Sequence, residues 1–483
     1  MGISFRLALS FCQKYASPIC IVLIFLFAAF LRLHALGNPA LWIDESISSI
    51  VAQKIAHTGQ PVLDSGFIYT RAVIYHYLVG FMFLFDESDF TARFISVLFG
   101  LASLILLYII GREYSEIAGV LAMALGAVFY IEVFFSRQAR FYEMFEFLFF
   151  LTLFLLYKST TSSRVSLRYL LAAITSFLIA LDTHVSALVL APFLIGYIIY
   201  YHRRQWYLAL IPLFCICWYV PYVLRLIGTT NSISHYTSSY ASYFVDVRYL
   251  LVLFLVGIVW GYFKNKCLTF TLVLPALILL AGVFFASLFA LRYASFFSFV
   301  LVLFSSLVFS FLIGKYGKSM IIPFIVFLII PSNLFFPYSY VTIFSPVDYQ
   351  LHDRSSPVID YKNVDLNSEI PVGVLFSPSY MWYHHKPDFV LAFSLTGRQK
   401  DSIVYNGQDI YSGAAVINTS LPSQPYTFYA DYFSLSKLTP SQGHFLQQIT
   451  TGCDETTYPD FIAYTCSHTY QPNSEHLNNT TRK

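Results

Sequence analysis

Long apolar segments recur along the first two-thirds of the chain and are separated by short polar stretches. A helix needs roughly 17 to 25 apolar residues to cross about 30 Å of hydrocarbon, and most of these segments are close to that length. Ala72–Phe85 is shorter and is expected only to dip into the membrane edge. The pattern predicts about eleven transmembrane helices, at Ser17–Leu36, Phe90–Gly111, Ile117–Val133, Arg140–Tyr157, Leu167–Leu181, Val185–Tyr201, Tyr207–Leu224, Tyr249–Phe263, Leu268–Leu291, Tyr293–Ile313 and Met320–Phe336.

An amphipathic helix is predicted directly after the first apolar segment, at about residues 43–57. Its apolar residues would form one face of a helix lying along the membrane surface. Asp44 and Glu45 lie off that face. One explanation of the two acids is structural, with Asp44 as the N-cap and Glu45 as a first-turn acid favoured by the helix dipole. The residues at helical spacing are Ile43, Ile47, Ile50, Val51 and Ile55.

From residue 337 the composition changes to that of a soluble domain. Short β-rich runs such as Val372–Phe376 and Phe389–Phe393 alternate with turn residues, which favours a small α/β unit. We therefore divide the chain into a transmembrane domain, residues 1–336, and a C-terminal domain, residues 337–483. Cys453 and Cys466 lie in this second domain and are expected to form a disulfide, which requires an oxidising compartment.

Composition agrees with a polytopic membrane protein. Of the 483 residues, 57% are hydrophobic and only 11% charged, against about 25% charged in soluble chains. The net charge of +3 is small for this length, and no basic run interleaved with aromatics points to nucleic acid. No Cys-x-x-Cys or His-Glu-x-x-His motif occurs, so no zinc site of recognisable spacing is expected.

Lysines indicate the orientation of the chain, because cytoplasmic loops are enriched in basic residues. An odd number of crossings places the termini on opposite faces, and nearly all loop lysines before the tail fall on the N-terminal side. The N-terminus is therefore predicted to be cytoplasmic and the C-terminal domain extracytoplasmic. The cytoplasmic lysines are Lys14, Lys158, Lys264, Lys266, Lys315 and Lys318, whereas several arginines fall near the external face and break the rule: Arg71, Arg93, Arg137, Arg140, Arg225 and Arg292.

With this topology, four groups of polar residues gather at the external face. Charged side chains at a membrane edge are costly and commonly line a polar substrate path. Structural alternatives exist: arginines as interface anchors or snorkelling side chains, an acid at a helix end, a histidine packed in a core. The groups are Asp44 with Glu45, the segment Arg137 to Glu143, Asp182 with His184, and Arg292 with Tyr293.

The order of these motifs resembles a known family. Trp-Ile-Asp-Glu-Ser at residues 42–46, Ser-Arg-Gln-Ala-Arg-Phe-Tyr-Glu at 136–143, Asp-Thr-His at 182–184 and Leu-Arg-Tyr at 291–293 are similar in order and spacing to the dolichyl-phosphate-mannose-protein mannosyltransferases and their bacterial relatives, including aminoarabinose transferases (glycosyltransferase family 39 type). The resemblance covers about residues 15–310. The tail matches only as a generic extracytoplasmic domain.

The resemblance implies a GT-C membrane glycosyltransferase that moves a sugar from a polyprenyl-phosphate donor to an acceptor hydroxyl on the extracytoplasmic face, with inversion. Asp44 would be the catalytic base, and Glu45 would orient the acceptor or share a metal. Cations at headgroup depth would hold the donor phosphate. The phosphate-binding residues would be Arg137, Arg140, His184 and Arg292, and the positioning residues Tyr142, Glu143, Asp182 and Tyr293.

The sequence departs from the family pattern in two respects. The Asp-x-Asp motif of metal-dependent relatives is missing, so no obligatory metal is expected, although a divalent ion remains possible. The chain lacks the sugar-binding domains that eukaryotic protein mannosyltransferases insert between crossings, which favours a bacterial or archaeal cell membrane and leaves protein, lipid and polysaccharide open as acceptors. Two other classes stay open: a transporter or flippase of lipid-linked sugars, which would be expected to show inverted repeats and broken helices near mid-membrane, neither of which the sequence indicates, and a non-catalytic assembly subunit.

Overall fold

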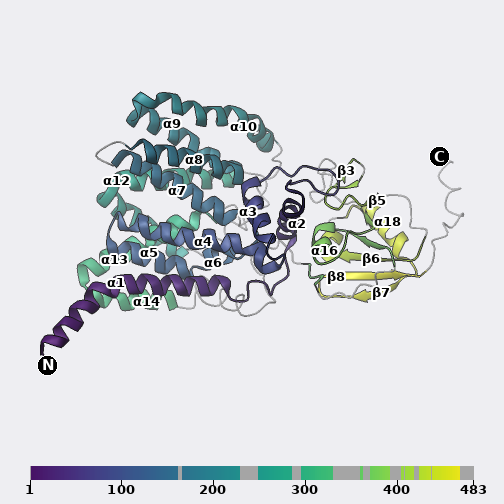
Figure 1. Cartoon of the computed structure of the whole chain (residues 1–483), viewed down its shortest axis with the longest axis horizontal. Coiled ribbons are helices and arrows are strands. Elements are labelled where there is room, and N and C mark those ends of the chain that lie inside the picture. The colour runs from purple at the N-terminus through teal and green to yellow at the C-terminus, as the bar shows by residue number, and fades with distance from the viewer. Residues whose placement is uncertain are drawn as a thin grey trace. The chain divides into compact units, whose positions relative to one another are not determined.

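A computed structural model describes residues 2–161, 166–228, 248–285, 295–329, 359–362, 370–391, 404–406, 408–417, 424–436 and 438–467. The chain forms two compact units (Figure 1). The helical unit comprises residues 1–39, 71–82 and 86–355. The C-terminal unit comprises residues 40–70, 83–85 and 356–483.

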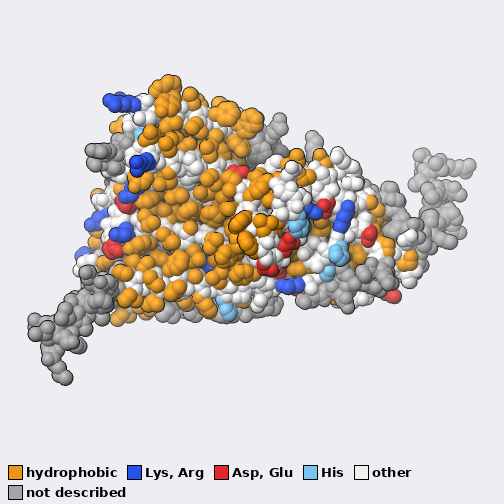
Figure 2. All heavy atoms as spheres, viewed as in Figure 1, with side chains coloured by type: hydrophobic (Ala, Val, Ile, Leu, Met, Phe, Trp, Pro, Cys, Tyr) orange, Lys and Arg blue, Asp and Glu red, His pale blue; other side chains and the backbone are white. Residues whose placement is uncertain are grey.

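Most of the predicted helices are present in the helical unit. Four helices are long and apolar enough to cross a membrane, or five if one bent pair counts as a span, among the described residues. Hydrophobic side chains cover much of the visible surface of this unit (Figure 2), as lipid contact requires. The count of eleven crossings stays a prediction. The helices are α1 (Gly2–Leu33), α3 (Val73–Phe83), α4 (Asp89–Arg112), α5 (Glu116–Val128), α6 (Tyr130–Ser136), α7 (Tyr142–Thr161), α8 (Leu167–Thr183), α9 (Leu190–Tyr201), α10 (Leu210–Gly228), α12 (Arg248–Phe285), α13 (Phe297–Tyr316) and α14 (Ile321–Ile329), with 3₁₀ turns η1 (Val185–Val189), η2 (Arg203–Ala209) and η5 (Lys318–Met320).

The continuity of the helices departs from the prediction at one place and agrees with it at another. The segment 117–133, expected to be one transmembrane helix, is broken at Phe129, whose ψ of 121° is extended, and α5 and α6 meet at 62°. The predicted boundary between 249–263 and 268–291 is retained as a break inside α12, where Asn265 leaves helical geometry. The Asn265 side-chain oxygen accepts from the Leu268 N–H and so caps the second half of α12.

The C-terminal unit contains a mixed eight-stranded sheet in the order β3-β4-β5-β2-β1-β6-β8-β7. Its central strands are parallel: β1 pairs with β2 and β6, and β2 with β5, while the outer pairs are antiparallel. A Cβ at Gly373 would lie 2.1 Å from the Phe389 ring, so only glycine fits there. The elements are β1 (Val372–Val374), α16 (Ser377–Tyr383), β2 (Phe389–Leu391), β3 (Val404–Tyr405), β4 (Gln408–Asp409), β5 (Ala415–Ile417), β6 (Tyr426–Asp431), α17 (Tyr432–Leu435), α18 (Pro440–Thr450), β7 (Asp454–Thr457) and β8 (Phe461–Cys466).

The amphipathic helix forms as predicted, as α2 (Ile43–Thr58), but its apolar face does not lie on lipid. Ile43 and Ile47 are part of the hydrophobic core of the C-terminal sheet. Ile50, Val51 and Ile55 pack with Leu63, Phe67, Tyr69, Met381 and Tyr411. The tail of the same chain therefore covers the apolar face that we expected to contact lipid, and the position of the helix along the membrane surface stays a prediction.

Further contacts fasten the segment 40–70 to the tail. The Leu41 N–H donates to the Tyr383 hydroxyl at 2.7 Å. Gly413 has a φ of +61°, and a Cβ there would lie 2.8 Å from the Asp64 carbonyl oxygen, so the close approach of these two backbones depends on glycine. The boundary that we predicted at residue 336 thus differs from the observed division, which groups α2 with the C-terminal unit.

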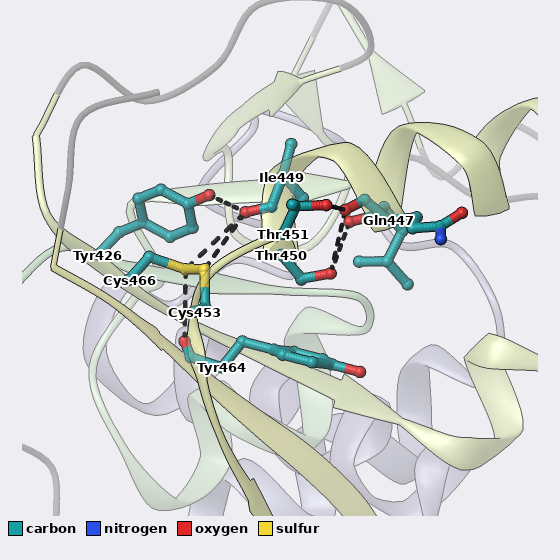
Figure 3. The surroundings of a disulfide bond; sticks show 9 residues. Tyr426, Gln447, Ile449, Thr450, Thr451, Cys453, Tyr464 and Cys466 are labelled. Carbon is teal, nitrogen blue, oxygen red and sulfur yellow. Dashed lines mark hydrogen bonds between the residues drawn. A yellow bond between two sulfur atoms is a disulfide. The ribbon is translucent and has the colours of Figure 1, made fainter. Parts of the chain in front are cut away.

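Cys453 and Cys466 are joined by a disulfide between the start of β7 and the end of β8 (Figure 3). Beside it, the Ile449 carbonyl in α18 accepts a hydrogen bond from the Tyr426 hydroxyl. The disulfide and this bond hold the end of α18 against the sheet. Of the other cysteines, Cys20, Cys215, Cys217 and Cys267 are free thiols.

Candidate functional site

The two acids of α2 occupy the first turn of the helix in the C-terminal unit. Trp42, not Asp44, is the N-cap residue, so the structural explanation of Asp44 as a cap is wrong. The Glu45 carboxylate accepts from the Trp42 N–H at 3.2 Å, which is the return half of a capping box. Glu45 thus has a structural task, whereas the partly exposed Asp44 is not the residue that caps the helix.

Arg140 lies in the helical unit, in the turn between α6 and α7. Its guanidinium carbon lies 4.8 Å from the Phe141 ring centroid and 5.8 Å from that of Tyr142. The backbone beneath it is fixed, because the Ser96 hydroxyl donates to the Arg140 carbonyl at 2.8 Å and lies 2.9 Å from the Tyr75 hydroxyl. A buried cation stacked on aromatic faces keeps its charge and a defined position.

Two of the predicted site residues, Tyr142 and His184, line the same small cavity of about 10 Å³, close to the space that one water needs. The His184 ring packs 5.4 Å from the Phe145 ring, and its Nδ1 accepts from the Ser186 N–H at 3.2 Å. Ser295 also lines this cavity. The Arg140 guanidinium shares its aromatic neighbours, so Arg140, Tyr142 and His184 form one cluster.

Arg137, only three residues before Arg140, has a different environment. Its Nη1 donates to the carbonyls of Leu31, Arg32 and His34 at 3.0, 3.0 and 2.8 Å. These carbonyls belong to the last turn of α1 and the residues after it, which have no partner within the helix. The phosphate role of Arg137 stays a prediction.

Arg32 and Arg93 serve backbone carbonyls in the same way. Both are fully buried. Arg93 Nη1 donates to the carbonyls of Leu36 and Pro39, and Arg32 Nη1 donates to that of Ala127 at 3.1 Å, next to the break between α5 and α6. Arg93 and Arg137, which we place near the external face against the lysine distribution, thus have a structural reason to be there: they bind carbonyls of irregular backbone.

Asp182 lies in the last turn of α8 and caps a different helix. Its carboxylate Oδ2 accepts from the Ile74 N–H at 3.0 Å, and its carbonyl accepts from the Ala72 N–H at 3.1 Å. These N–H groups lie at the start of α3, where a negative charge is favoured by the helix dipole. The contacts support the reading of Asp182 as a helix-end acid, and its positioning role stays a prediction.

Glu143 points into a cluster that the sequence reading missed. Carboxylate oxygens of Glu132, Glu143 and Glu146 lie within 4.8 Å of one another, and all three side chains are buried. The Ser298 hydroxyl donates to Glu132 and lies 3.4 Å from Glu146 Oε2. Such an all-oxygen set suits a hard divalent cation. The sequence did contain a signal for this cluster. Glu132 and Glu146 lie inside apolar segments, where acids are rare unless they have a function.

The predicted residues therefore fall into separate groups. Arg140, Tyr142 and His184 lie together, Glu143 belongs to the acidic cluster, and Asp44 and Glu45 belong to the C-terminal unit. Arg292 and Tyr293 lie outside the described residues. The expectation that all of them border a single pocket stays a prediction.

Comparison with known proteins tests the resemblance to the mannosyltransferase family. Residues 71–226 match the model of a family described as dolichyl-phosphate-mannose-protein mannosyltransferase. The predicted resemblance to this mannosyltransferase family is confirmed. The match runs from α3 into α10 and contains Arg137, Arg140, Tyr142, Glu143, Asp182 and His184. No curated protein sequence matches the chain.

Solved structures show a likeness in fold over nearly the whole chain. ArnT from Cupriavidus metallidurans in the apo state is similar with a TM-score of 0.62 and 11% identity, over 94% of this chain and 98% of that chain. ArnT bound to undecaprenyl phosphate gives 0.59 and 11%, over 93% and 98%. The archaeal oligosaccharyltransferase AglB from Archaeoglobus fulgidus, in complex with an inhibitory peptide and a dolichol-phosphate, gives 0.54 and 11%, over 94% and 75%. At this identity the likeness shows the fold, which is of the GT-C type.

Proposed function

We propose that this protein is an inverting glycosyltransferase that takes a sugar from a polyprenyl-phosphate donor and passes it to an acceptor hydroxyl on the extracytoplasmic face of a cell membrane. The observation that carries the proposal is the likeness to ArnT over nearly the full length of both chains, because ArnT has been solved with undecaprenyl phosphate bound. The family match over residues 71–226 supports the same chemistry.

Arg140 is the residue that we assign first to the donor phosphate. It is buried, and its guanidinium is held on Phe141 and Tyr142. Arginine binds phosphate oxygens through two parallel N–H groups. His184 and Tyr142 would position the donor next to it, and Arg292 and Tyr293 would complete the site from the segment before α13.

Asp44 is proposed as the base. It would accept the proton of the acceptor hydroxyl while that oxygen forms a bond to the anomeric carbon. The bond from the anomeric carbon to the phosphate oxygen breaks, and its electron pair leaves on the phosphate, which the arginines neutralise. A stabilised anion needs no general acid to leave, and one displacement inverts the anomeric centre. Glu45, which closes the capping box with Trp42, would hold the first turn of α2 and with it Asp44.

No obligatory metal is part of the proposal. If a divalent ion binds, the residues suited to hold it are Glu132, Glu143 and Glu146. An ion there would neutralise crowded carboxylates in the helical unit. The proton, the acceptor oxygen and the leaving phosphate are handled by the chain's own side chains in every step above.

The test replaces Asp44 by Asn and measures sugar transfer in membranes with a polyprenyl-phosphate-linked donor. We expect the rate to fall by about 10² to 10⁴, while expression and donor binding stay unchanged. Asp64→Asn is the matched control. Asp64 lies in the same unit, is ion-paired with Lys54 at 2.6 Å at the surface, and should change transfer little. Normal turnover by the Asp44 variant would remove Asp44 from the mechanism.

The acceptor can be identified by comparing cells with and without the gene. Mass spectrometry of glycans, lipids and proteins should show one class of molecule that loses a sugar in the deletion strain. The loss would appear in the lipid, polysaccharide or protein fraction of the cells, depending on which class is the acceptor. A lipid-linked sugar accumulating on one side of the membrane, with no acceptor losing a sugar, would instead favour a flippase.

A further inference from the structure

A second cavity in the helical unit has a chemistry that the transfer reaction does not use. Its volume is about 380 Å³, within the range of small-molecule sites. It lies where α5 begins, α13 ends and α12 breaks at Asn265. Its lining residues are Tyr114, Ser115, Ile117, Trp260, Lys264, Leu307, Ser310, Phe311, Gly314 and Lys315.

The polar lining of this cavity consists of three hydroxyl groups and two cations, with no acid among the lining residues. Lys264 Nζ lies 5.0 Å from the Trp260 ring and Lys315 Nζ 5.8 Å from the Phe311 ring. The Ser115 and Ser310 hydroxyls lie 2.8 Å apart. Their mutual bond uses one of two hydroxyl protons, so one donor remains for a ligand.

The acids nearest in sequence are already neutralised by other cations. Glu113 pairs with Lys158 at 2.6 Å, and Glu116 pairs with Arg112 at 2.9 Å. Lys264 and Lys315 form no ion pair with a carboxylate in the part of the chain that the structure describes. The cavity also lies at the N-terminal end of α5, where the helix dipole favours an anion. Its unbalanced charge is therefore positive.

The rest of the lining is apolar. Ile117, Leu307, Trp260 and Phe311 come from three helices that pack together. Gly314 lies on the same face of α13 as Leu307, Phe311 and Lys315, and a Cβ added there would meet nothing within 4 Å. The glycine therefore leaves the cavity open. A ligand that fits must combine an anionic group with an apolar body.

We propose that this cavity binds the phosphate headgroup of an anionic lipid, with the phosphate between Lys264 and Lys315 and the apolar chains along Leu307 and Phe311. Basic pockets between membrane helices recognise lipid headgroups in this way. The site is separate from the Arg140 cluster, and the inference does not rest on the proposed transfer reaction.

The experiment is native mass spectrometry of the purified full-length protein in detergent. The probes are phosphatidylglycerol, undecaprenyl phosphate and the zwitterionic phosphatidylcholine. The wild type should bind phosphatidylglycerol at least 10-fold more tightly than phosphatidylcholine. Lys264→Ala with Lys315→Ala should weaken phosphatidylglycerol binding by about 10- to 30-fold, since each lysine near an anionic lipid contributes about 1 kcal/mol.

The matched control is Lys266→Ala, which removes an exposed lysine of α12 that does not line the cavity. It should leave binding within about 2-fold. Gly314→Leu fills the cavity without changing charge and should weaken binding as strongly as the double variant. The pair Lys264→Arg with Lys315→Arg should restore it, which separates a loss of charge from a loss of folding.

Three results would overturn the proposal. The double alanine variant could bind phosphatidylglycerol as tightly as the wild type, or Lys266→Ala could weaken it equally, in which case the lysines act as a diffuse surface charge. Inorganic phosphate could displace the lipid completely at equal affinity, which would make the cavity a free-phosphate site. Tight binding of undecaprenyl phosphate that is lost in the double variant would support the proposal and identify the polyprenyl lipid as a source.

Discussion

The helical unit and the C-terminal unit place buried charge in different surroundings. In the C-terminal unit, buried acids stand among neutral donors: Asp409 accepts from the hydroxyls of Ser377 and Ser412, each at 2.6 Å, and Asp431 accepts from the Ser434 N–H at 2.7 Å. In the helical unit, arginines bind the carbonyls of broken helices, and three glutamates lie within 4.8 Å of one another.

This difference suggests a structural role for the C-terminal unit and a functional role for the helical unit. Asp409 closes a turn through its Oδ2 and Asp431 caps α17 through its Oδ1, although the second carboxylate oxygen of each is buried without a hydrogen-bond partner among the described residues. Three crowded carboxylates and an arginine are costly to bury, and ionisable groups inside apolar helices commonly mark functional sites. We therefore expect the C-terminal unit to act as a stable platform that carries α2, and the helical unit to hold the phosphate-binding groups.

The largest effect should come from Arg137→Ala. It leaves the carbonyls of Leu31, Arg32 and His34 without their donor. Buried hydrogen bonds to charged groups contribute about 1.5 to 3 kcal/mol each, so stability should fall by about 3 kcal/mol or more. A thermal unfolding scan of the detergent-solubilised protein measures this.

Arg140→Ala is the matched comparison for Arg137→Ala. It should weaken donor binding by about 10-fold or more, because a charge-assisted contact to phosphate is lost. An Arg137 variant with unchanged Tm and lost donor binding would reverse our assignment of the two arginines.

The second effect concerns the disulfide. Cys453→Ser opens a link across a sequence separation of 13 residues, for which loop-closure entropy gives about 3 kcal/mol. Hydrogen exchange should become faster in β7, β8 and the end of α18, while the helical unit exchanges as before. Equal destabilisation of both units would show that the C-terminal unit is not an independent platform.

A third effect depends on pH. Burial raises the pKa of Asp431 to about 6 from its ordinary 3.8, so between about pH 4 and pH 6 the folded chain binds more protons than the unfolded chain. Stability should therefore fall as the pH rises through this window and stay level above it. Asp431→Asn should flatten the profile and stabilise the unit at pH 7 by about 2 to 3 kcal/mol.

Hydrogen exchange of β6 and β8 as a function of pH measures this stability, with exposed Asp454→Asn as a control that should change nothing. Asparagine retains the ability to cap α17, so loss of the cap does not obscure the result. A variant that keeps the wild-type slope would assign the pH dependence to another group.

The smallest expected effect is that of metal removal. We expect EDTA to leave sugar transfer within about 2-fold, since every step of the proposed reaction uses side chains alone. Loss of transfer that Mn²⁺ restores would contradict this. Glu146→Gln would then show whether Glu132, Glu143 and Glu146 hold the ion, because an isosteric amide weakens a carboxylate site.

Local periodicity predicted the elements well. The amphipathic helix was expected at about 43–57 and is α2, Ile43–Thr58. The runs expected at Val372–Phe376 and Phe389–Phe393 contain β1 and β2. These features depend on the spacing of apolar residues within one segment, which the sequence displays directly. The motif order also sufficed for the mannosyltransferase resemblance.

Pairings between distant segments could not be predicted in the same way. Arg137 reaches a carbonyl 106 residues away, and Asp182 accepts from an N–H 108 residues earlier, at the start of α3. Neither partner is encoded near the residue itself. An acid beside a helix start and an arginine beside an apolar segment look the same in sequence whether they bind a carbonyl, an N–H or a substrate.

The sequence by itself determined that the chain has apolar helices, a β-rich tail and an acid-bearing amphipathic helix, because each follows from residue spacing over a few turns. Only the tertiary structure decided that the tail, not lipid, covers α2, that Arg137 serves the end of α1 while Arg140 stacks on aromatics, and that three glutamates meet. The physical reason is that an apolar face or a charge specifies only the kind of partner it needs, and the fold selects which one it receives.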